Sequence, residues 1–355
     1  MKIARLDVRA ADVPLTRPYA VASHATDAAS MLLLRLVTEG RAVGLGAATP
    51  EPEVNGDTRD GAVAELLDIA DAIAGRAVAE PSAFSSLLAQ LRSPGARMAL
   101  DLALHDLWAQ AVGKPLVDLL GRQHTALPTS VTIGLGDVAM TLREADEYTA
   151  RGFTALKVKI GQDLGLDVER LVRLREHVGR GVTLRVDGNL GYQPQQLLQL
   201  LRATQALDLE FVEQPLPCDR IDAQRALPAA ITAMLMADES LHGEDDARAL
   251  AAPPRAFGSF NIKLVKCGGI RPARAIAAIA HDHGLPVMWG CMDESRIAIA
   301  AALHAAYSCA ATRWLDLDGH LDLAHDFATG GFTLERGVLR LGDGPGLGVV
   351  AAAGW

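Results

Sequence analysis

Five charged residues recur along the middle of the chain at a nearly constant spacing. They are Lys159, Asp187, Glu213, Asp238 and Lys263, and consecutive members lie 25 to 28 residues apart. Each comes at the end of a short apolar stretch that is typical of a buried strand. If each interval holds one strand and one helix, parallel strands bring all five side chains to the same end of a sheet. The spacing therefore predicts a single site built from residues that are distant in the sequence.

The three acids of this series form a set of hard oxygen ligands. Carboxylates without a neighbouring histidine or cysteine suit Mg²⁺, whereas zinc is usually bound through nitrogen or sulfur. We therefore expect Asp187, Glu213 and Asp238 to bind one Mg²⁺. Taken one at a time, each acid has a simpler interpretation as a helix cap or a salt-bridge partner.

The two lysines bracket the acids and should lie on opposite sides of the metal. Lys159 and Lys263 are then placed to remove a proton from one face of a substrate and to return one to the other face. Such a pair suits a weakly acidic proton on a carbon next to a carboxylate, because a divalent metal stabilises the charge of the resulting enediolate. A lysine that forms a Schiff base is the alternative, but that chemistry does not require three acids.

A further lysine, Lys157, lies two positions before Lys159 in the stretch ALKVKIG. Alternate residues of a strand point to the same face, so the two ammonium groups should be neighbours. Repulsion between them should lower the pKa of Lys159 and make it a better general base near neutral pH. Lys266, three residues after Lys263, should not share the face of Lys263 in a strand, and we expect it to be structural.

The elements that must position these residues change character near residue 128. Residues 1–50 contain strand-like stretches and residues 60–122 are helical, which together indicate a small α+β domain. Eight short apolar strands then alternate with amphipathic helices, which predicts a TIM-type (β/α) barrel of the α/β class. A doubly wound open sheet is the structural alternative. The predicted strands are TSVTIGL, ALKVKIG, TLRVDGN, EFVEQP, LMADES, FNIKLVK, PVMWGC and RWLDLDG.

Composition restricts the class of protein. Of the 355 residues, 50% are hydrophobic and 22% are charged, which is typical of a globular chain. The formal net charge of −9 argues against a general nucleic-acid binder. No apolar run reaches the ~18–20 residues that a membrane span needs, and the start lacks the apolar core of a signal peptide. Four separated cysteines without a CxxC pair favour a reduced, cytoplasmic setting.

Five short motifs carry the candidate residues, namely KVK, VDGN, EQP, ADES and NIKLVKCGG. They resemble the motifs of the enolase superfamily, in its muconate-lactonizing subgroup, and the resemblance extends over essentially the whole chain. It implies an α+β capping domain at residues 1–125, a catalytic barrel at residues 126–320, and a C-terminal segment, residues 321–355, that packs back on the capping domain. It also implies that the two lysines are the acid and the base, that the three acids bind Mg²⁺, and that Asn189 lies near the site without being a main ligand.

The end of the eighth predicted strand, WLDLDGH, narrows the resemblance to dipeptide epimerases. Asp316 and Asp318 share one face there, and two neighbouring negative charges need a cation. By the resemblance, they hold the α-ammonium group of the first residue of a dipeptide, while the metal holds the C-terminal carboxylate. The α-carbon of the second residue then lies between the two lysines. Taken alone, either aspartate has a simpler interpretation as the cap of a turn before Gly319.

Residues near the mouth of the barrel should contact the second side chain of the dipeptide. In the L-Ala-D/L-Glu epimerases an arginine pairs with the glutamate side chain, and by the resemblance His24 stands at that place here. A glutamate side chain is therefore poorly matched. Glu51 and Asp293 favour a lysine or arginine side chain if they face the pocket, and Lys157 completes the expected substrate-binding set. A small or apolar second residue stays open.

Two other activities and one other class of protein compete with this interpretation. N-acylamino acid racemase or o-succinylbenzoate synthase activity uses the same metal and lysines, but such substrates carry no free ammonium group for Asp316 and Asp318. Muconate cycloisomerase activity is disfavoured for the same reason. A binding protein on this fold is disfavoured because all five core residues are present. The expected partners are a dipeptide substrate and further copies of this chain in a homo-oligomer, but neither nucleic acid nor a membrane.

Overall fold

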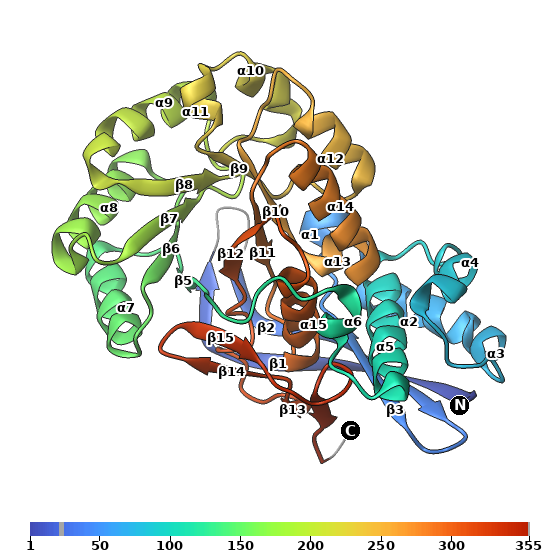
Figure 1. Ribbon diagram of the computed structural model, residues 1–355. Helices are drawn as coiled ribbons and strands as arrows, with labels where there is room; N and C mark the ends of the chain where they lie inside the picture. Colours follow the sequence, from blue (N-terminus) through green and yellow to red (C-terminus); the bar gives the residue numbers. More distant parts are fainter. Residues whose placement is uncertain (21–24, 354–355) are drawn as a thin grey trace.

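The computed structural model describes residues 1–20 and 25–353. Its N-terminal part is an antiparallel three-stranded sheet covered by helices, and an eight-stranded parallel barrel follows it (Figure 1). The strands of the sheet are β1 (Ile3–Ala20), β2 (Ala25–Thr38) and β3 (Val43–Ala48). The helices of this part are α1 (Pro52–Asn55), α2 (Arg59–Asp68), α3 (Ala70–Ile73), the 3₁₀ helix η1 (Pro81–Phe84), α4 (Ser85–Leu88), α5 (Pro94–Val112) and α6 (Leu116–Leu120).

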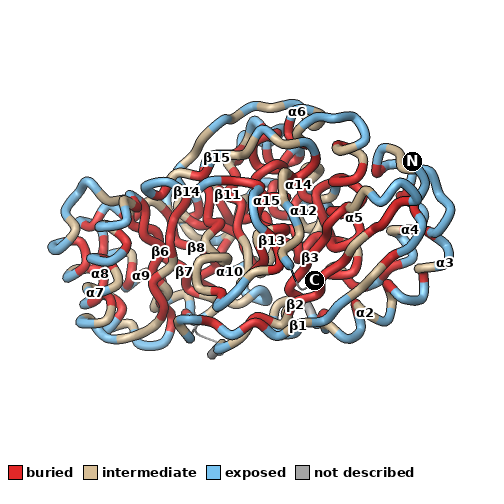
Figure 2. Tube along the Cα trace, turned by 90° about the horizontal axis from the view of Figure 1, so that it is seen from below, coloured by how far each residue is buried: buried red, intermediate tan, exposed pale blue. Residues whose placement is uncertain are grey.

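Small residues allow α5 to lie directly on β3. A side-chain carbon at Gly46 would lie 1.9 Å from the carbonyl oxygen of Ala99, and one at Gly44 would lie 2.3 Å from that of Ala103. Neither distance is compatible with a side chain, so glycine is what permits this close approach. Figure 2 shows buried positions along α5 and β3 and along the barrel strands, with exposed positions around the outside.

The barrel strands follow one another in chain order around the sheet. They are β5 (Val131–Ile133), β6 (Ala155–Lys159), β7 (Thr183–Asp187), β8 (Leu209–Glu213), β9 (Leu235–Ala237), β10 (Ser259–Ile262), β11 (Val287–Gly290) and β12 (Thr312–Asp316). The sheet closes where the backbone N–H of Ser130 donates to the carbonyl oxygen of Leu315 at 3.0 Å, just before β5. Each of the eight predicted strands overlaps one of these strands. The structure therefore confirms the predicted TIM-type barrel with an N-terminal capping domain.

Helices connect the strands and form an outer ring around the barrel (Figure 1). They are α7 (Val138–Ala150), α8 (Leu164–Val178), α9 (Pro194–Ala203), η2 (Gln205–Leu207), η3 (Cys218–Arg220), α10 (Ile221–Arg225), α11 (Ala229–Thr232), α12 (Glu244–Ala251), α13 (Leu264–Cys267), α14 (Ile270–Asp282) and α15 (Arg296–Tyr307). One prediction is wrong in detail, because FNIKLVK is not strand throughout. The strand ends at Ile262, and a short helix, α13, begins directly after Lys263.

The register of the parallel strands explains why the charged residues converge. Lys159 of β6 pairs with Asp187 of β7, and Asp187 pairs with Glu213 of β8. Asp238 follows β9 directly, and Lys263 follows β10 directly. The carboxyl ends of parallel strands meet at one mouth of a barrel, so the regular spacing in sequence becomes closeness in space.

The chain after the barrel returns to the capping domain. It contains β13 (Ala328–Gly330), β14 (Phe332–Glu335), β15 (Val338–Leu341) and β16 (Val349–Ala351), and β15 pairs with β4 (Leu127–Pro128). Asp106 of α5 joins the two parts, because its carboxylate accepts hydrogen bonds from the backbone N–H groups of Leu45 (2.9 Å) and Leu347 (2.8 Å). The boundaries of the predicted three-part division stay a prediction.

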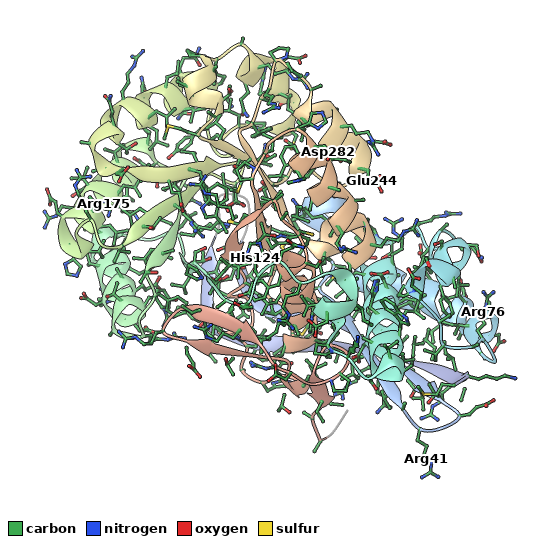
Figure 3. The ribbon with its side chains drawn as sticks, viewed as in Figure 1. Arg41, Arg76, His124, Arg175, Glu244 and Asp282 are labelled. Carbon is green, nitrogen blue, oxygen red and sulfur yellow. The ribbon has the colours of Figure 1, made fainter. Side chains whose placement is uncertain are left out.

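The outer surface carries charged side chains that take no part in this convergence. Figure 3 shows Arg41 and Arg76 at the periphery, away from the barrel, and both are exposed. Among the described residues, no helix has both the length and the apolar character that crossing a membrane requires.

Candidate metal centre and active site

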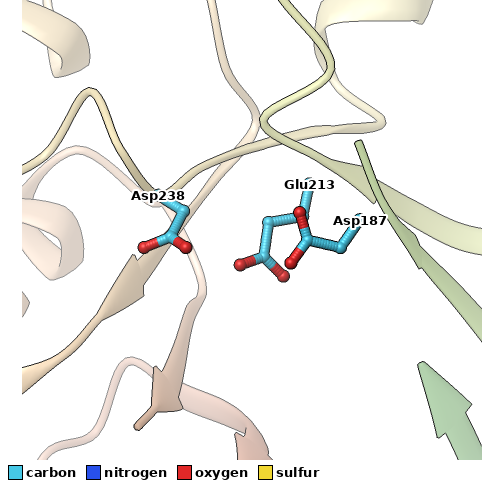
Figure 4. Close-up of side chains that lie close together, drawn as sticks. All are labelled: Asp187, Glu213 and Asp238. Carbon is cyan, nitrogen blue, oxygen red and sulfur yellow. The ribbon is translucent and has the colours of Figure 1, made fainter. Parts of the chain in front are cut away.

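Three buried carboxylates converge at the mouth of the barrel (Figure 4). Each of Asp187, Glu213 and Asp238 offers an oxygen atom, and these atoms all lie within 4.8 Å of one another. The residues are at most 1% exposed. Three buried carboxylate oxygens, without nitrogen or sulfur among them, fit a hard divalent cation such as Mg²⁺.

Lys157 lies among these carboxylates. Its Nζ atom is 3.0 Å from Asp187 Oδ2, 2.9 Å from Glu213 Oε2 and 2.8 Å from Asp316 Oδ2. Burial alone lowers the pKa of Lys157, but the carboxylates of Asp187, Asp316 and Glu213 outweigh burial and hold that pKa above its usual range. The positive charge of Lys157 is therefore neutralised by these three acids. The sequence argument considered only the repulsion between Lys157 and Lys159 and did not include these ion pairs.

The second lysine of the pair, Lys159, does point to the same side. Its Nζ donates to Asp187 Oδ2 at 2.7 Å, the same oxygen that Lys157 approaches, and to Asn189 Oδ1 at 3.0 Å. Across the acids, Lys263 Nζ lies 2.9 Å from Asp238 Oδ2. The strands that carry the acids, β7, β8 and β9, separate the strands of the two lysines, β6 and β10. Lys159 and Lys263 thus line one cavity, of about 730 Å³, from its two sides.

Two buried residues hold the carboxylates in place. Asn261 Nδ2 donates to Glu213 Oε1 at 2.7 Å, and Lys266 Nζ donates to the carboxylate and the backbone oxygen of Asp238. Because α13 is a helical turn, Lys266 reaches the same carboxylate as Lys263, which a continuous strand would not allow. Sequence spacing did not indicate the contact of Lys266, since it depends on the turn after β10.

The two aspartates of WLDLDGH have different surroundings. Asp316 Oδ1 accepts from Ser130 Oγ at 2.6 Å, and Asp316 Oδ2 faces Lys157, so both oxygens are engaged inside the protein. Asp318 Oδ2 accepts from the backbone N–H of Thr132 at 2.7 Å, and Asp318 lines the cavity. Burial and the neighbouring Asp316 raise the pKa of Asp318 to about 7. Asp318 is therefore the better placed of the two to receive a cation from the cavity.

Acidic side chains outnumber basic ones on the cavity wall. Among the described residues, the acids are Asp27, Glu51, Glu53, Glu144, Asp238, Glu239, Asp293, Asp316, Asp318 and Asp322, and the bases are Arg17, Lys157, Lys159 and Lys263. Arg17 is already engaged by α7, donating to Glu147 Oε2 at 2.7 Å and to Tyr148 Oη at 2.8 Å. The wall thus offers a cationic ligand several partners, and an anionic side chain few.

The predicted specificity residues are partly placed by the structure. Glu51 and Asp293 both line the cavity, while His24 lies outside the described residues. Tyr19, from the end of β1, donates its hydroxyl to Asp293 Oδ2 at 2.9 Å. Sequence reasoning missed Tyr19 and Glu239. Glu239 could have been identified from the sequence, because it directly follows Asp238 in the ADES motif.

Comparison with known proteins gives family matches over most of the chain. Residues 5–121 match the N-terminal domain of the mandelate racemase / muconate lactonizing enzyme family, and residues 140–353 match the enolase C-terminal domain-like family. A protein of Methylococcus capsulatus named L-Lys-D/L-Arg epimerase is 53% identical over 353 residues, or 99% of each chain. One of Bacillus subtilis named L-Ala-D/L-Glu epimerase is 32% identical over 359 residues, covering 99% of this chain and 98% of that one.

Solved structures agree with these matches. The crystal structure of a dipeptide epimerase from Methylococcus capsulatus, complexed with Mg and the dipeptide L-Arg-D-Lys, superposes with a TM-score of 0.95 at 52% identity, covering 99% of this chain and all of that one. The relatives are named as epimerases, which are isomerases, and this confirms the predicted enzyme class. The Mg-bound relative and the acid cluster likewise confirm Mg²⁺ as the cofactor. The chain belongs to the mandelate racemase / muconate lactonizing enzyme family of the enolase superfamily.

Proposed function

We propose that this protein is an Mg²⁺-dependent epimerase of dipeptides with cationic side chains, acting at the α-carbon of the second residue. The observation that carries the proposal is the placement of Lys159 and Lys263 on two sides of one acid-lined cavity. An α-carbon between two such lysines loses its proton to one amine and regains a proton from the other ammonium group, which inverts its configuration.

The remaining groups would bind the metal and the substrate. Asp187, Glu213 and Asp238 would hold the metal, which when bound supplies positive charge beside the substrate carboxylate and so makes the α-proton easier to remove. Asp318 would accept the α-ammonium group of the first residue. For the transfer to proceed in either direction, one lysine must be neutral while the other carries a proton.

The acidic wall supports a cationic second residue. Glu51 and Asp293 line the cavity. Apart from the three lysines, the basic side chain among the described lining residues is Arg17, and it is already bound to side chains of α7. The Methylococcus capsulatus protein that is 53% identical and a Desulforapulum autotrophicum protein that is 46% identical are both named L-Lys-D/L-Arg epimerase. An acidic second residue would instead place like charges together.

A deuterium-incorporation screen tests the proposal. Dipeptides that pair alanine, lysine or arginine with acidic, apolar or cationic second residues would be incubated in D₂O with Mg²⁺, and deuterium at the α-carbon read by mass spectrometry. We expect incorporation and epimerization chiefly with lysine or arginine second. Incorporation confined to acidic second residues would overturn the specificity, and none in any dipeptide would overturn dipeptide epimerization itself.

Racemization of N-acylated amino acids is the second candidate. It is favoured by the shared lysines and by a Bacillus cereus relative, 28% identical over 357 residues, that is named N-succinyl-L-Arg/Lys racemase. Asp318 argues against it, because an N-succinyl group would bring a negative charge towards that carboxylate. Including N-succinyl-lysine in the screen separates the two activities. Muconate cycloisomerization is less well supported, since muconate also lacks an ammonium group. The homo-oligomeric state and the cytoplasmic location stay predictions.

A further inference from the structure

Asn189 begins a turn in which two successive residues other than glycine have positive φ. It follows β7 by two positions and has φ +37°, and the next residue, Leu190, has φ +68°. Side chains with a Cβ rarely adopt positive φ, so such a conformation persists only where surrounding contacts impose it. Here the Asn189 N–H donates to Asp187 Oδ1 at 3.1 Å, and the Leu190 N–H donates to the Gln214 carbonyl at 2.9 Å.

The turn places the Asn189 amide between a lysine and an acid. Its Oδ1 atom accepts from Lys159 Nζ at 3.0 Å, and its Nδ2 atom donates to Glu239 Oε1 at 2.9 Å. Glu239 Oε1 accepts from the NH₂ side of the amide, and the Lys159 ammonium group donates to its oxygen, so both contacts require the same orientation. The orientation of the amide is thereby fixed, with its oxygen towards Lys159.

The lysine on the other side of the cavity is held differently. Lys263 Nζ lies 2.9 Å from Asp238 Oδ2 and 4.0 Å from the sulfur of Met292, and no amide oxygen contacts it within the part of the chain that the structure describes. Asp187 and Asp238, which face the two lysines, are also the proposed metal ligands. The Asn189 oxygen is therefore an acceptor that Lys159 does not share with the metal, and Lys263 has no equivalent.

We propose that Asn189 is a positioning residue for Lys159, that Glu239 fixes the orientation of its amide, and that the pair acts on proton transfer at one face of the substrate. This inference rests on the proposed two-lysine epimerization and adds an asymmetry to it. A misplaced base can lower the rate of proton transfer by ~10-fold to ~100-fold, so the effect is measurable.

The test measures α-deuterium exchange from each epimer of one active dipeptide separately, in D₂O with saturating Mg²⁺. Lys159→Ala identifies the epimer whose proton faces Lys159, because exchange of the other epimer needs only Lys263. The test variant is Asn189→Gly, which removes the amide but suits a positive φ, so backbone strain does not enter the comparison.

In Asn189→Gly we expect α-deuterium exchange to fall ~10-fold or more for the epimer that Lys159→Ala no longer exchanges. Exchange of the other epimer should change less than about twofold. An unchanged ratio between the epimers, or a fall at the face of Lys263, would overturn the proposal. If the wild type exchanges no dipeptide, the proposed function fails instead, so the two failures are distinguishable.

Glu239 supplies an independent pair of variants. Glu239→Gln retains an oxygen that can accept from Asn189 and should keep the wild-type ratio between the two epimers within about twofold. Glu239→Leu removes that acceptor and should shift the ratio in the same direction as Asn189→Gly. Equal effects of both Glu239 variants would show that Glu239 does not act through the amide.

Discussion

At the level of single residues, Glu51 and Asp293 are acids in surroundings that disfavour their charged forms. Burial, followed by the charge of Asp293, raises the pKa of Glu51 to about 7. Burial raises the pKa of Asp293 to about 6, although the hydrogen bond from Tyr19 opposes the rise. A cation that enters between them relieves both the burial cost and the mutual repulsion. The wall is therefore suited to a positively charged substrate side chain.

The first prediction concerns charge selection by this wall. Glu51→Gln and Asp293→Asn should each lower kcat/KM for a dipeptide with lysine second by ~10-fold or more, because a hydrogen bond to a charged group contributes about 1.5–3 kcal/mol. The same variants should change kcat/KM for an alanine second residue much less. Steady-state kinetics with both substrates provides the measurement, and Glu335→Gln, at an exposed residue of β14 outside the cavity lining, is the matched control. Equal losses for the two substrates would contradict charge selection.

The second prediction concerns the ammonium group of the first residue. Asp318→Asn should raise KM for free dipeptides by ~10-fold or more and leave kinetics with N-acylated analogues unchanged, because only the former present a cation to Asp318. The pKa of about 7 adds a pH test. In the wild type, KM should rise as the pH falls below 7, since a protonated Asp318 loses its charge. If KM of the variant equals that of the wild type, Asp318 does not bind the ammonium group.

How far individual residues could be predicted depended on how each is fixed in space. Asp187, Glu213 and Asp238 could be predicted as a cluster because strand periodicity alone brings them together. The partners of Lys157 could not, because a contact to Asp316 joins residues 159 positions apart and depends on how the barrel closes. The link from Asn189 to Glu239 was also missed, because it depends on the conformation of the turn after β7.

At the level of elements, the packing of α5 on β3 gives the third prediction. Gly46→Ala should destabilise the protein by at least ~1–3 kcal/mol, because the new carbon would lie 1.9 Å from the backbone oxygen of Ala99 and one element must move. Thermal unfolding of the variant measures the loss. Gly181→Ala is the control, since nothing lies within 4 Å of the position of its Cβ. An unchanged melting temperature in Gly46→Ala would mean that the contact between α5 and β3 is not rigid.

Elements were predictable where hydrophobic periodicity was long and regular. The eight barrel strands and the helices between them follow this pattern, and the structure bears out all eight strands. The misassigned element, α13, is four residues long and continues an apolar run, so periodicity does not distinguish it from the end of a strand. A tertiary contact stabilises α13, since its helical turn brings Lys266 to Asp238.

At the level of the whole molecule, acids in and next to the cavity couple proton binding to stability. Burial raises the pKa of Glu294 to about 8, and the pKa values of Glu51 and Asp318 to about 7. Each group then binds a proton in the folded state at a pH where the unfolded chain has lost it. The stability that this provides is complete below the unfolded pKa and is lost as the pH rises through the folded pKa.

The last prediction follows from this loss of stability with rising pH. Without Mg²⁺ or substrate, the melting temperature should be higher at pH 6.5 than at pH 8.5, because these acids ionise within that interval. His304 and His320 have pKa values lowered by burial to about 4 and about 3, so they oppose the trend mainly at pH values below their unfolded value of 6.5. Scanning calorimetry across the interval measures the slope, and Glu51→Gln should reduce it by removing one of the titrating groups. A melting temperature that is constant, or that rises towards pH 8.5, would mean that these acids are already compensated by charges within the folded chain.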